Sequence, residues 1–198
     1  MSEEQPRLGF ETHPLTAERW SDLETLFGPR GACAGCWCMY WRLGHAEFSS
    51  LSGDGNRFAL RQIVETGAVP GLLAYADGKP VGWVSVEPRR AFLRLSRSRI
   101  LKPVDDQPVW SIVCFFIAKS SRKQGLSVHL LNEAVRYAAG QGAKIVEGYP
   151  VDLQNVEKFP DAFAFIGTLS AFRQAGFKEV LRRSEKRPVM RYMIESQA

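Results

Sequence analysis

"VWSIVCFFIAKSSRKQGLSVHLLNEAVRYAAGQG", residues 109–142, contains the clearest succession of structural elements in this chain. Its first part, residues 109–118, is almost continuously apolar, which favours a strand that is covered on both faces and lies centrally in a sheet. The residues after the loop carry apolar side chains at helical spacing, namely Val128, Leu131, Val135 and Ala138. Because Gly140 and Gly142 end this pattern, we predict a helix that begins near Gly125.

The loop between this strand and this helix has the composition of an anion-binding site. Arg122 and Lys123 contribute positive charge, and Gly125 allows a ligand to approach the backbone closely. The first N–H groups of a helix have no partner within the helix and point towards an anion. A diphosphate group would fit this loop.

Helices and strands are also predicted on both sides of this segment. The residues before it predict a strand over 7–15, helices over 16–27 and 56–67, and a hairpin that turns at Asp77–Gly78. The residues after it predict a strand over 143–151, a helix over 168–177, and a closing antiparallel pair over 178–184 and 187–195. No repeat or linker divides the chain, so we expect a single domain over residues 1–198 of mixed α/β class, with a largely antiparallel sheet.

Two short motifs and the order of the elements resemble one known family. Residues 122–127 read as Arg-x-x-Gly-x-Ser, which is similar to motif A of the GNAT superfamily of N-acetyltransferases, usually Arg/Gln-x-x-Gly-x-Gly/Ala. Ser127 departs from that motif but is still small. "AFRQAGF", residues 171–177, resembles the family's Tyr-x-x-x-Gly-Phe, with Phe172 in place of the tyrosine. The resemblance extends from about residue 8 to 195 and implies the α/β (α+β) GNAT fold, a mixed, mostly antiparallel central sheet that is splayed at an acetyl-CoA cleft.

This resemblance implies that acetyl-CoA is the co-substrate and that no metal is needed. The pantetheine arm would pair with the backbone of the central strand, at Phe115, Phe116 and Ile117. The diphosphate would lie on the loop and the helix start, at Arg122, Lys123, Gln124, Gly125, Leu126 and Ser127. Phe172 would pack against the cofactor arm. A primary amine would attack the thioester directly, and a strand N–H would stabilise the oxyanion.

The proton donor and acceptor of that reaction are the least defined part of the site. Phe172 has no proton to give to the leaving thiolate, so another group or water must serve. Strand alternation places Glu147 and Tyr149 on one face of the strand over residues 143–151. We predict Tyr149 as the acid and Glu147 as the base on the amine, with water as the alternative donor.

"GACAGCWCMYWR", residues 31–42, has several interpretations. It contains three thiols, Cys33, Cys36 and Cys38. Together with His45 they could bind a structural zinc ion. Alternatively, the Cys-x-x-Cys spacing could form a redox pair. We favour reduced, metal-free thiols, because no second ligand pair exists in the chain. The stretch would then be a wall of the acceptor pocket, in which substrate contacts are expected from Trp37, Tyr40 and Arg42.

The composition limits the other function classes. The chain has 198 residues and a net charge of +5 from 26 basic and 21 acidic residues, a modest excess that predicts a preference for anionic ligands and no nucleic-acid partner. It shows no signal-peptide pattern and no apolar run of the roughly 20 residues that span a bilayer, so we expect a cytoplasmic protein without a membrane partner. The basic run over residues 87–99 predicts a solvated loop, or alternatively a contact to the adenosine phosphate or an acidic acceptor.

Several questions stay open in the sequence. The acceptor could be a small-molecule or a peptide amine, and the oligomeric state is undefined, with a homodimer among the alternatives. An acyl-CoA-binding module without turnover and a zinc-containing interaction domain are the competing functions.

Overall fold

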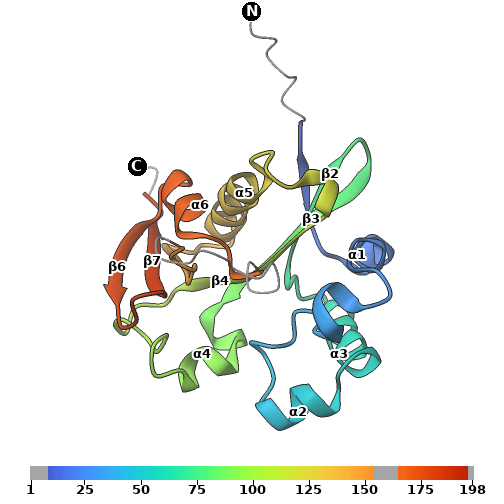
Figure 1. The fold of residues 1–198 in the computed structure, drawn as a ribbon, viewed down its shortest axis with the longest axis horizontal. Helices are drawn as coiled ribbons and strands as arrows, with labels where there is room; N and C mark the ends of the chain where they lie inside the picture. The colour runs from blue at the N-terminus through green and yellow to red at the C-terminus, as the bar shows by residue number, and fades with distance from the viewer. Residues whose placement is uncertain (1–8, 154–164, 196–198) are drawn as a thin grey trace, which may run out of the picture.

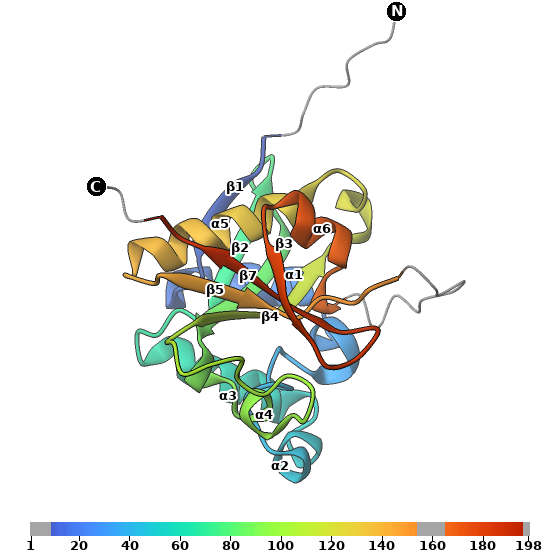
Figure 2. The same cartoon turned by 90° about the vertical axis from the view of Figure 1, so that its left-hand side faces the viewer.

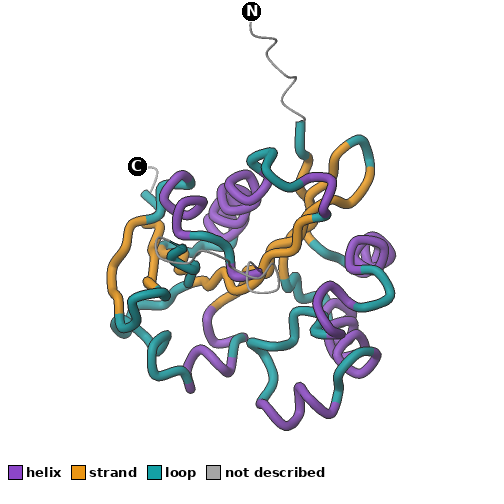
Figure 3. The backbone as a smooth tube through the Cα atoms, viewed as in Figure 1, coloured by secondary structure: helices purple, strands orange, loops and turns teal. Residues whose placement is uncertain are grey.

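A seven-stranded sheet with helices on both faces forms the body of the computed structural model, which describes residues 9–153 and 165–195 (Figures 1 and 3). The strand order is β1-β2-β3-β4-β5-β7-β6. Only β4 and β5 are parallel neighbours, and every other neighbouring pair is antiparallel. The mixed, mostly antiparallel sheet expected from the sequence is confirmed.

The elements follow the predicted order closely. The strands are β1 Glu11–Pro14, β2 Gly71–Ala76, β3 Lys79–Pro88, β4 Trp110–Ile117, β5 Ile145–Gly148, β6 Lys178–Arg182 and β7 Pro188–Met193. The helices are α1 Trp20–Phe27, α2 His45–Ser50, α3 Asp54–Glu65, α4 Leu93–Arg97, α5 Leu126–Gly140 and α6 Leu169–Gln174. The β2–β3 hairpin turns as expected at Asp77 and Gly78, both with positive φ, as a tight two-residue turn requires. Residues 7 and 8 of the first predicted strand lie outside the described residues.

Two apolar layers cover the sheet. α5 and α6 lie on one face, and α1 to α4 lie on the other (Figure 1). Ile112 and Phe115 of β4 point into the layer with α5, whereas Val113 and Cys114 both point into the opposite layer. Two successive residues on one face indicate a β-bulge, and the pairing of β3 with β4 shifts by one residue at this position. β4 is thus central, as its apolar sequence predicted.

β4 and β5 separate soon after they begin to pair. Their parallel pairing covers Trp110–Ile112 of β4 and then ends. Beyond it, the chain that continues β5 bridges to Thr168 through Val151 instead of returning to β4. Among the described residues, the C-terminal half of β4 therefore has a strand neighbour only on its β3 side, and the sheet is open there.

Phe172 fills the wedge between the separating segments. Its side chain is fully buried, and a Cβ added to Gly148 would lie 2.1 Å from its ring. The same ring would lie 2.9 Å from a Cβ on Gly167, so glycine at both positions is what admits it. The ring packs edge-on against Phe115, with centroids 6.1 Å apart.

Two expectations differ from the structure. The basic run over residues 87–99 is not a solvated loop, because it completes β3 and forms α4, and its Arg89 is directed inward. Helix α2 has no clear sequence pattern and was not anticipated. In the part of the chain that the structure describes, no helix combines the length and apolar character needed to cross a bilayer.

Candidate functional site

A cleft of about 500 Å³ lies where β4 and β5 separate. Six of the residues predicted to hold the cofactor line it, namely Phe115, Phe116, Ile117, Arg122, Lys123 and Ser127. Its opposite wall comes from two distant segments, through Ala32 and Cys33 and through Phe165, Gly167 and Thr168. The cleft thus joins the central strand, the start of α5 and part of the cysteine-rich stretch.

The backbone of β4 presents unpaired polar groups to this cleft. Ala118 donates its N–H to the Val81 carbonyl on β3 at 2.9 Å, which makes this a hydrogen-bonded pair of the antiparallel ladder. Such pairs alternate, so Phe116 also faces β3, whereas the N–H and C=O groups of Phe115 and Ile117 face the other way. On that side β5 has already diverged. The N–H groups of these two residues are therefore offered to a ligand that pairs like an added strand, whereas their carbonyls accept from Cys114 Sγ at 3.9 Å and from Arg122 Nε at 3.4 Å.

The start of α5 completes one end of the cleft with positive potential. Gly125 precedes the helix at φ +79°, and its carbonyl accepts the N–H groups of Val128 and His129. The free N–H groups of the first turn and the side chains of Arg122 and Lys123 point to the same region. Nε of Arg122 also lies 3.4 Å from the Ile117 carbonyl. This end of the cleft can hold an anion such as a diphosphate.

The remaining predicted cofactor residues lie around the cleft without lining it. Gln124 is exposed, and its amide donates to the Ser120 carbonyl at 3.0 Å. Leu126 is buried beneath the loop, and Phe172 lies one layer behind the wall, in contact with Phe115. Phe172 thus supports the strand residue that faces the cleft, and its expected contact with a cofactor stays a prediction.

Glu147 and Tyr149 are enclosed in a buried polar network. Both are 1% exposed, and the Tyr149 hydroxyl donates to Glu147 Oε1 at 2.7 Å. Arg89 contacts both groups, and Arg191 Nε donates to the other carboxylate oxygen at 2.8 Å. Ser111 Oγ lies 2.9 Å from the Tyr149 hydroxyl. The structure thus brings the predicted acid and base together, but away from the walls of the cleft.

This environment keeps the phenol of Tyr149 protonated. Burial raises its pKa well above the usual value, and the adjacent Glu147 carboxylate raises it further. The network extends to Asp105, whose carboxylate accepts hydrogen bonds from both terminal nitrogens of Arg191, at 2.7 and 3.0 Å. Each buried cation here has a carboxylate partner, as burial of charge requires.

The cysteine-rich stretch does not gather its thiols. Cys33 is exposed at the cleft, whereas Cys38 is buried with its sulfur 3.1 Å from that of Cys114 on β4. Burial, followed by the nearby Cys38, raises the pKa of Cys36 to about 11. All four cysteines are free thiols, and the described residues contain no cluster of three or more His, Cys, Asp or Glu side chains suited to a metal ion.

The three predicted acceptor contacts have different surroundings. Trp37 is 5% exposed and stacks on Trp20, so it belongs to the core instead of a pocket surface. Arg42 is buried and forms an ion pair with Glu87. Tyr40 alone is exposed, at 38%, and its ring lies edge-on to Phe165, whose side chain lines the cleft. Alternation within a short aromatic run could not have distinguished these three positions.

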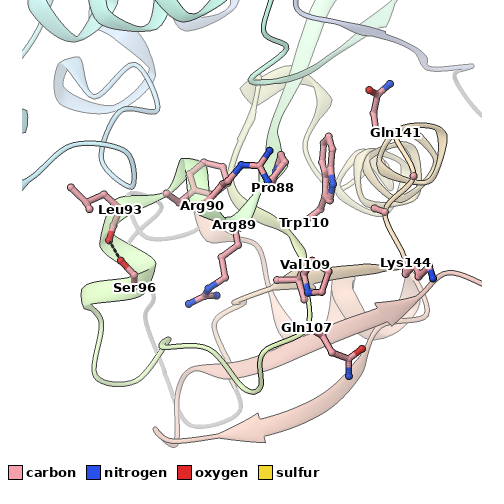
Figure 4. A pocket seen from close by; sticks show the side chains of 14 residues that line it. Pro88, Arg89, Arg90, Leu93, Ser96, Gln107, Val109, Trp110, Gln141 and Lys144 are labelled. Atoms are coloured by element: carbon pink, nitrogen blue, oxygen red, sulfur yellow. Dashed lines mark hydrogen bonds between the residues drawn. The ribbon is translucent and has the colours of Figure 1, made fainter.

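A larger hollow of about 950 Å³ lies at the other end of β4. Figure 4 shows Trp110 between Arg90 and Pro88 on one side and Gln141 and Lys144 on the other. Here β4 and β5 are still paired, so their edges are occupied and offer no main-chain groups to a ligand. The splayed cleft is therefore the better candidate site, although it is the smaller of the two.

Comparison of the sequence with known protein families gives one match. A sequence model of the acetyltransferase (GNAT) family matches residues 36–157. No curated protein matches significantly.

Solved structures resemble the whole fold. An N-acetyltransferase, PaiA of Thermoplasma acidophilum in complex with coenzyme A, is 15% identical, with a TM-score of 0.53 over 94% of this chain and 99% of that chain. A GNAT family acetyltransferase from Streptococcus agalactiae is 12% identical, with a TM-score of 0.56 over 95% and 97% of the two chains. A ribosomal-protein-alanine N-acetyltransferase from Brucella melitensis is 14% identical, with a TM-score of 0.52 over 93% and 99%. At these identities the likeness concerns the fold.

The surroundings of the cysteines predict their order of alkylation. At pH 8, iodoacetamide should modify the exposed Cys33 first, because a pKa of about 11 leaves only about 0.1% of Cys36 as thiolate. Between pH 8 and pH 10 the rate at Cys36 should rise about tenfold per pH unit, since its thiolate fraction does. Peptide mass spectrometry of wild type and Cys33→Ser measures both rates. Equal modification of Cys33 and Cys36 at pH 8 would contradict this account.

Proposed function

This chain belongs to the acetyltransferase (GNAT) family, and we propose that it transfers an acetyl group from acetyl-CoA to a primary amine. The observation that carries this proposal is the pair of main-chain N–H groups, of Phe115 and Ile117, that face the cleft beside the positively charged start of α5. A pantetheine arm needs a strand edge, and a diphosphate needs a helix N-terminus with cations nearby. The cleft supplies both next to each other.

The proposed binding mode assigns the cofactor along the cleft. The pantetheine amides pair with the backbone of Phe115 and Ile117, and the diphosphate lies against Arg122, Lys123 and the first turn of α5. The thioester then lies near the N-terminal part of this open edge, close to the bulge in β4. Phe172 supports this edge from behind through Phe115.

The proposed reaction is direct attack by the neutral amine on the thioester carbonyl. The main-chain N–H of Phe115 stabilises the developing oxyanion, because it faces the cleft on the side from which β5 has diverged. The C–N bond forms as the C–S bond breaks, the amine loses a proton, and the CoA thiolate gains one. We assign both proton exchanges to water. Glu147 and Tyr149 instead hold the end of β5 in place.

Variants of the anion-binding loop test the cofactor site. Arg122→Ala should weaken acetyl-CoA binding by about 10- to 150-fold, since a charge-assisted hydrogen bond contributes about 1.5–3 kcal/mol. Gly125→Val should also weaken it, because a β-branched residue at φ +79° is strained and crowds the approach to the backbone. Isothermal titration calorimetry measures both dissociation constants.

Arg90→Ala is the matched control, because it removes a cation from the larger hollow and leaves the cleft intact. The proposed site would be wrong if Arg90→Ala bound acetyl-CoA more weakly while Arg122→Ala and Gly125→Val kept the wild-type dissociation constant. The cofactor would then bind in the larger hollow, at the other end of β4.

The variant Tyr149→Phe tests whether water or the Tyr149 hydroxyl donates the proton to the leaving thiolate. We expect kcat to stay within about threefold of wild type, because the hydroxyl is enclosed with Glu147 and Arg89. The free energy of unfolding should fall by about 1–3 kcal/mol, since the buried network loses a hydrogen bond. Steady-state CoA release and urea denaturation measure these two effects. A fall of about 100-fold in kcat with an altered pH profile would instead make Tyr149 the acid.

A further inference from the structure

Arg187, in the turn between β6 and β7, has two buried nitrogens without a hydrogen-bond partner. These are Nε and Nη2, and both are shielded from solvent. A buried cation without a counter-charge is costly, so native proteins pair such groups almost without exception. Arg89, Arg182 and Arg191 in this chain each contact at least one carboxylate. The missing hydrogen-bond partner of Nε and Nη2 of Arg187 therefore requires an explanation.

The two unpartnered nitrogens lie on one edge of the guanidinium plane. Their N–H bonds are parallel, and together they match the two oxygens of a planar carboxylate. Arg182 shows this geometry nearby, since its Nε and Nη2 bind the two oxygens of Glu179 at 2.7 and 2.8 Å. At Arg187 the same edge has the same geometry but no hydrogen-bond partner.

The surroundings of Arg187 are aromatic and positively charged. Burial lowers the pKa of the Arg187 guanidinium, and the nearby Tyr40 offsets part of that effect. The guanidinium of Arg94 lies over the Tyr40 ring, 4.1 Å from its centroid, and donates to the carbonyls of Leu43 and Gly44. Arg94 thus covers one face of the Tyr40 ring.

This region adjoins the open cleft. Tyr40 contacts Phe165, which lines the cleft, with ring centroids 6.5 Å apart. The β6–β7 turn is fixed to the end of the β5 segment, because the Asp152 N–H donates to the Lys186 carbonyl at 3.0 Å. Figure 2 shows this turn where β6 and β7 meet, at the edge of the sheet.

We propose that the acceptor is an amino carboxylate whose carboxylate binds Nε and Nη2 of Arg187 and whose apolar part packs on Tyr40. The inference rests on the proposed acetyltransferase function and narrows its substrate class. Sequence reasoning had considered Arg42 for a carboxylate, but that side chain is already paired with Glu87. In this assignment Arg187 is a specificity residue that touches the acceptor and takes no part in proton transfer.

Matched pairs of amines test this assignment by turnover. Wild type should acetylate phenylalanine with kcat/KM at least tenfold above that for 2-phenylethylamine, which lacks only the carboxylate, and leucine should exceed 3-methylbutylamine similarly. Arg187→Met should abolish both preferences while changing kcat/KM for the two amines by less than threefold. Lys186→Met, an exposed neighbour, is the control and should keep the wild-type preference. Retention of the preference in Arg187→Met, or its absence in wild type, would overturn the proposal.

A binding measurement keeps the test independent of turnover. In the presence of CoA, wild type should bind 3-phenylpropionate at least tenfold more tightly than 3-phenylpropanamide, and Arg187→Met should bind both equally. If no amine is acetylated but this difference is found, the acetyltransferase proposal fails and the carboxylate site stands. If wild type shows no difference, the carboxylate site fails whatever the turnover results.

The stability of the variant separates a binding role from a structural one. Arg187→Met removes an unpaired buried cation, so its urea midpoint should equal or exceed that of wild type. A markedly lower midpoint, together with equal losses of kcat/KM for phenylalanine and for 2-phenylethylamine, would show that Arg187 maintains the fold and would overturn the proposal.

Discussion

β4 and β5 pair over Trp110–Ile112 and then separate, which leaves one edge of the central strand without a neighbour. In the interior of a sheet, unpaired N–H and C=O groups are costly, so such an edge persists only where something else satisfies it. Three features maintain the separation. The bulge at Val113 changes the course of β4, the Phe172 ring occupies the wedge against Gly148, and Val151 bridges to Thr168 instead of to β4. The cleft, the proposed oxyanion donor and the anion site all depend on this open edge.

The buried charges near the base of the cleft have a different task. Glu147 accepts hydrogen bonds from Arg89, in the short 3-10 helix Arg89–Ala91 directly after β3, and from Arg191 on β7. It thereby links β5 to β7 on one side and to the segment after β3 on the other, close to the point where β5 leaves β4. Removal of one partner would leave an uncompensated charge, so the network rigidifies the strand end. Its burial is the ground for our proposal that Glu147 and Tyr149 hold the strand end and leave the proton exchanges to water.

The parts of the fold that the sequence predicted have local signals. Asp77–Gly78 requires positive φ values at successive residues, the apolar run of β4 requires cover on both faces, and Gly125 marks a helix start. The site residues that sequence analysis missed have no such signal. Arg89 reaches Glu147, 58 residues away, from a run that has the composition of a solvated loop. Arg187 is one of many arginines, and only the packing of the β6–β7 turn leaves its edge buried and unpartnered. The burial of Trp37 beside the exposed Tyr40 depends on tertiary contacts too.

Amide hydrogen exchange at three consecutive residues of β4 tests the open edge most directly. NMR-detected exchange should slow at Phe115 and Ile117 when acetyl-CoA is added, because their N–H groups gain a partner or lose contact with water. Exchange at Phe116 should change much less, because its N–H already faces β3. Equal protection of all three residues before acetyl-CoA is added, and no change afterwards, would contradict the claim that this strand edge is the cofactor site.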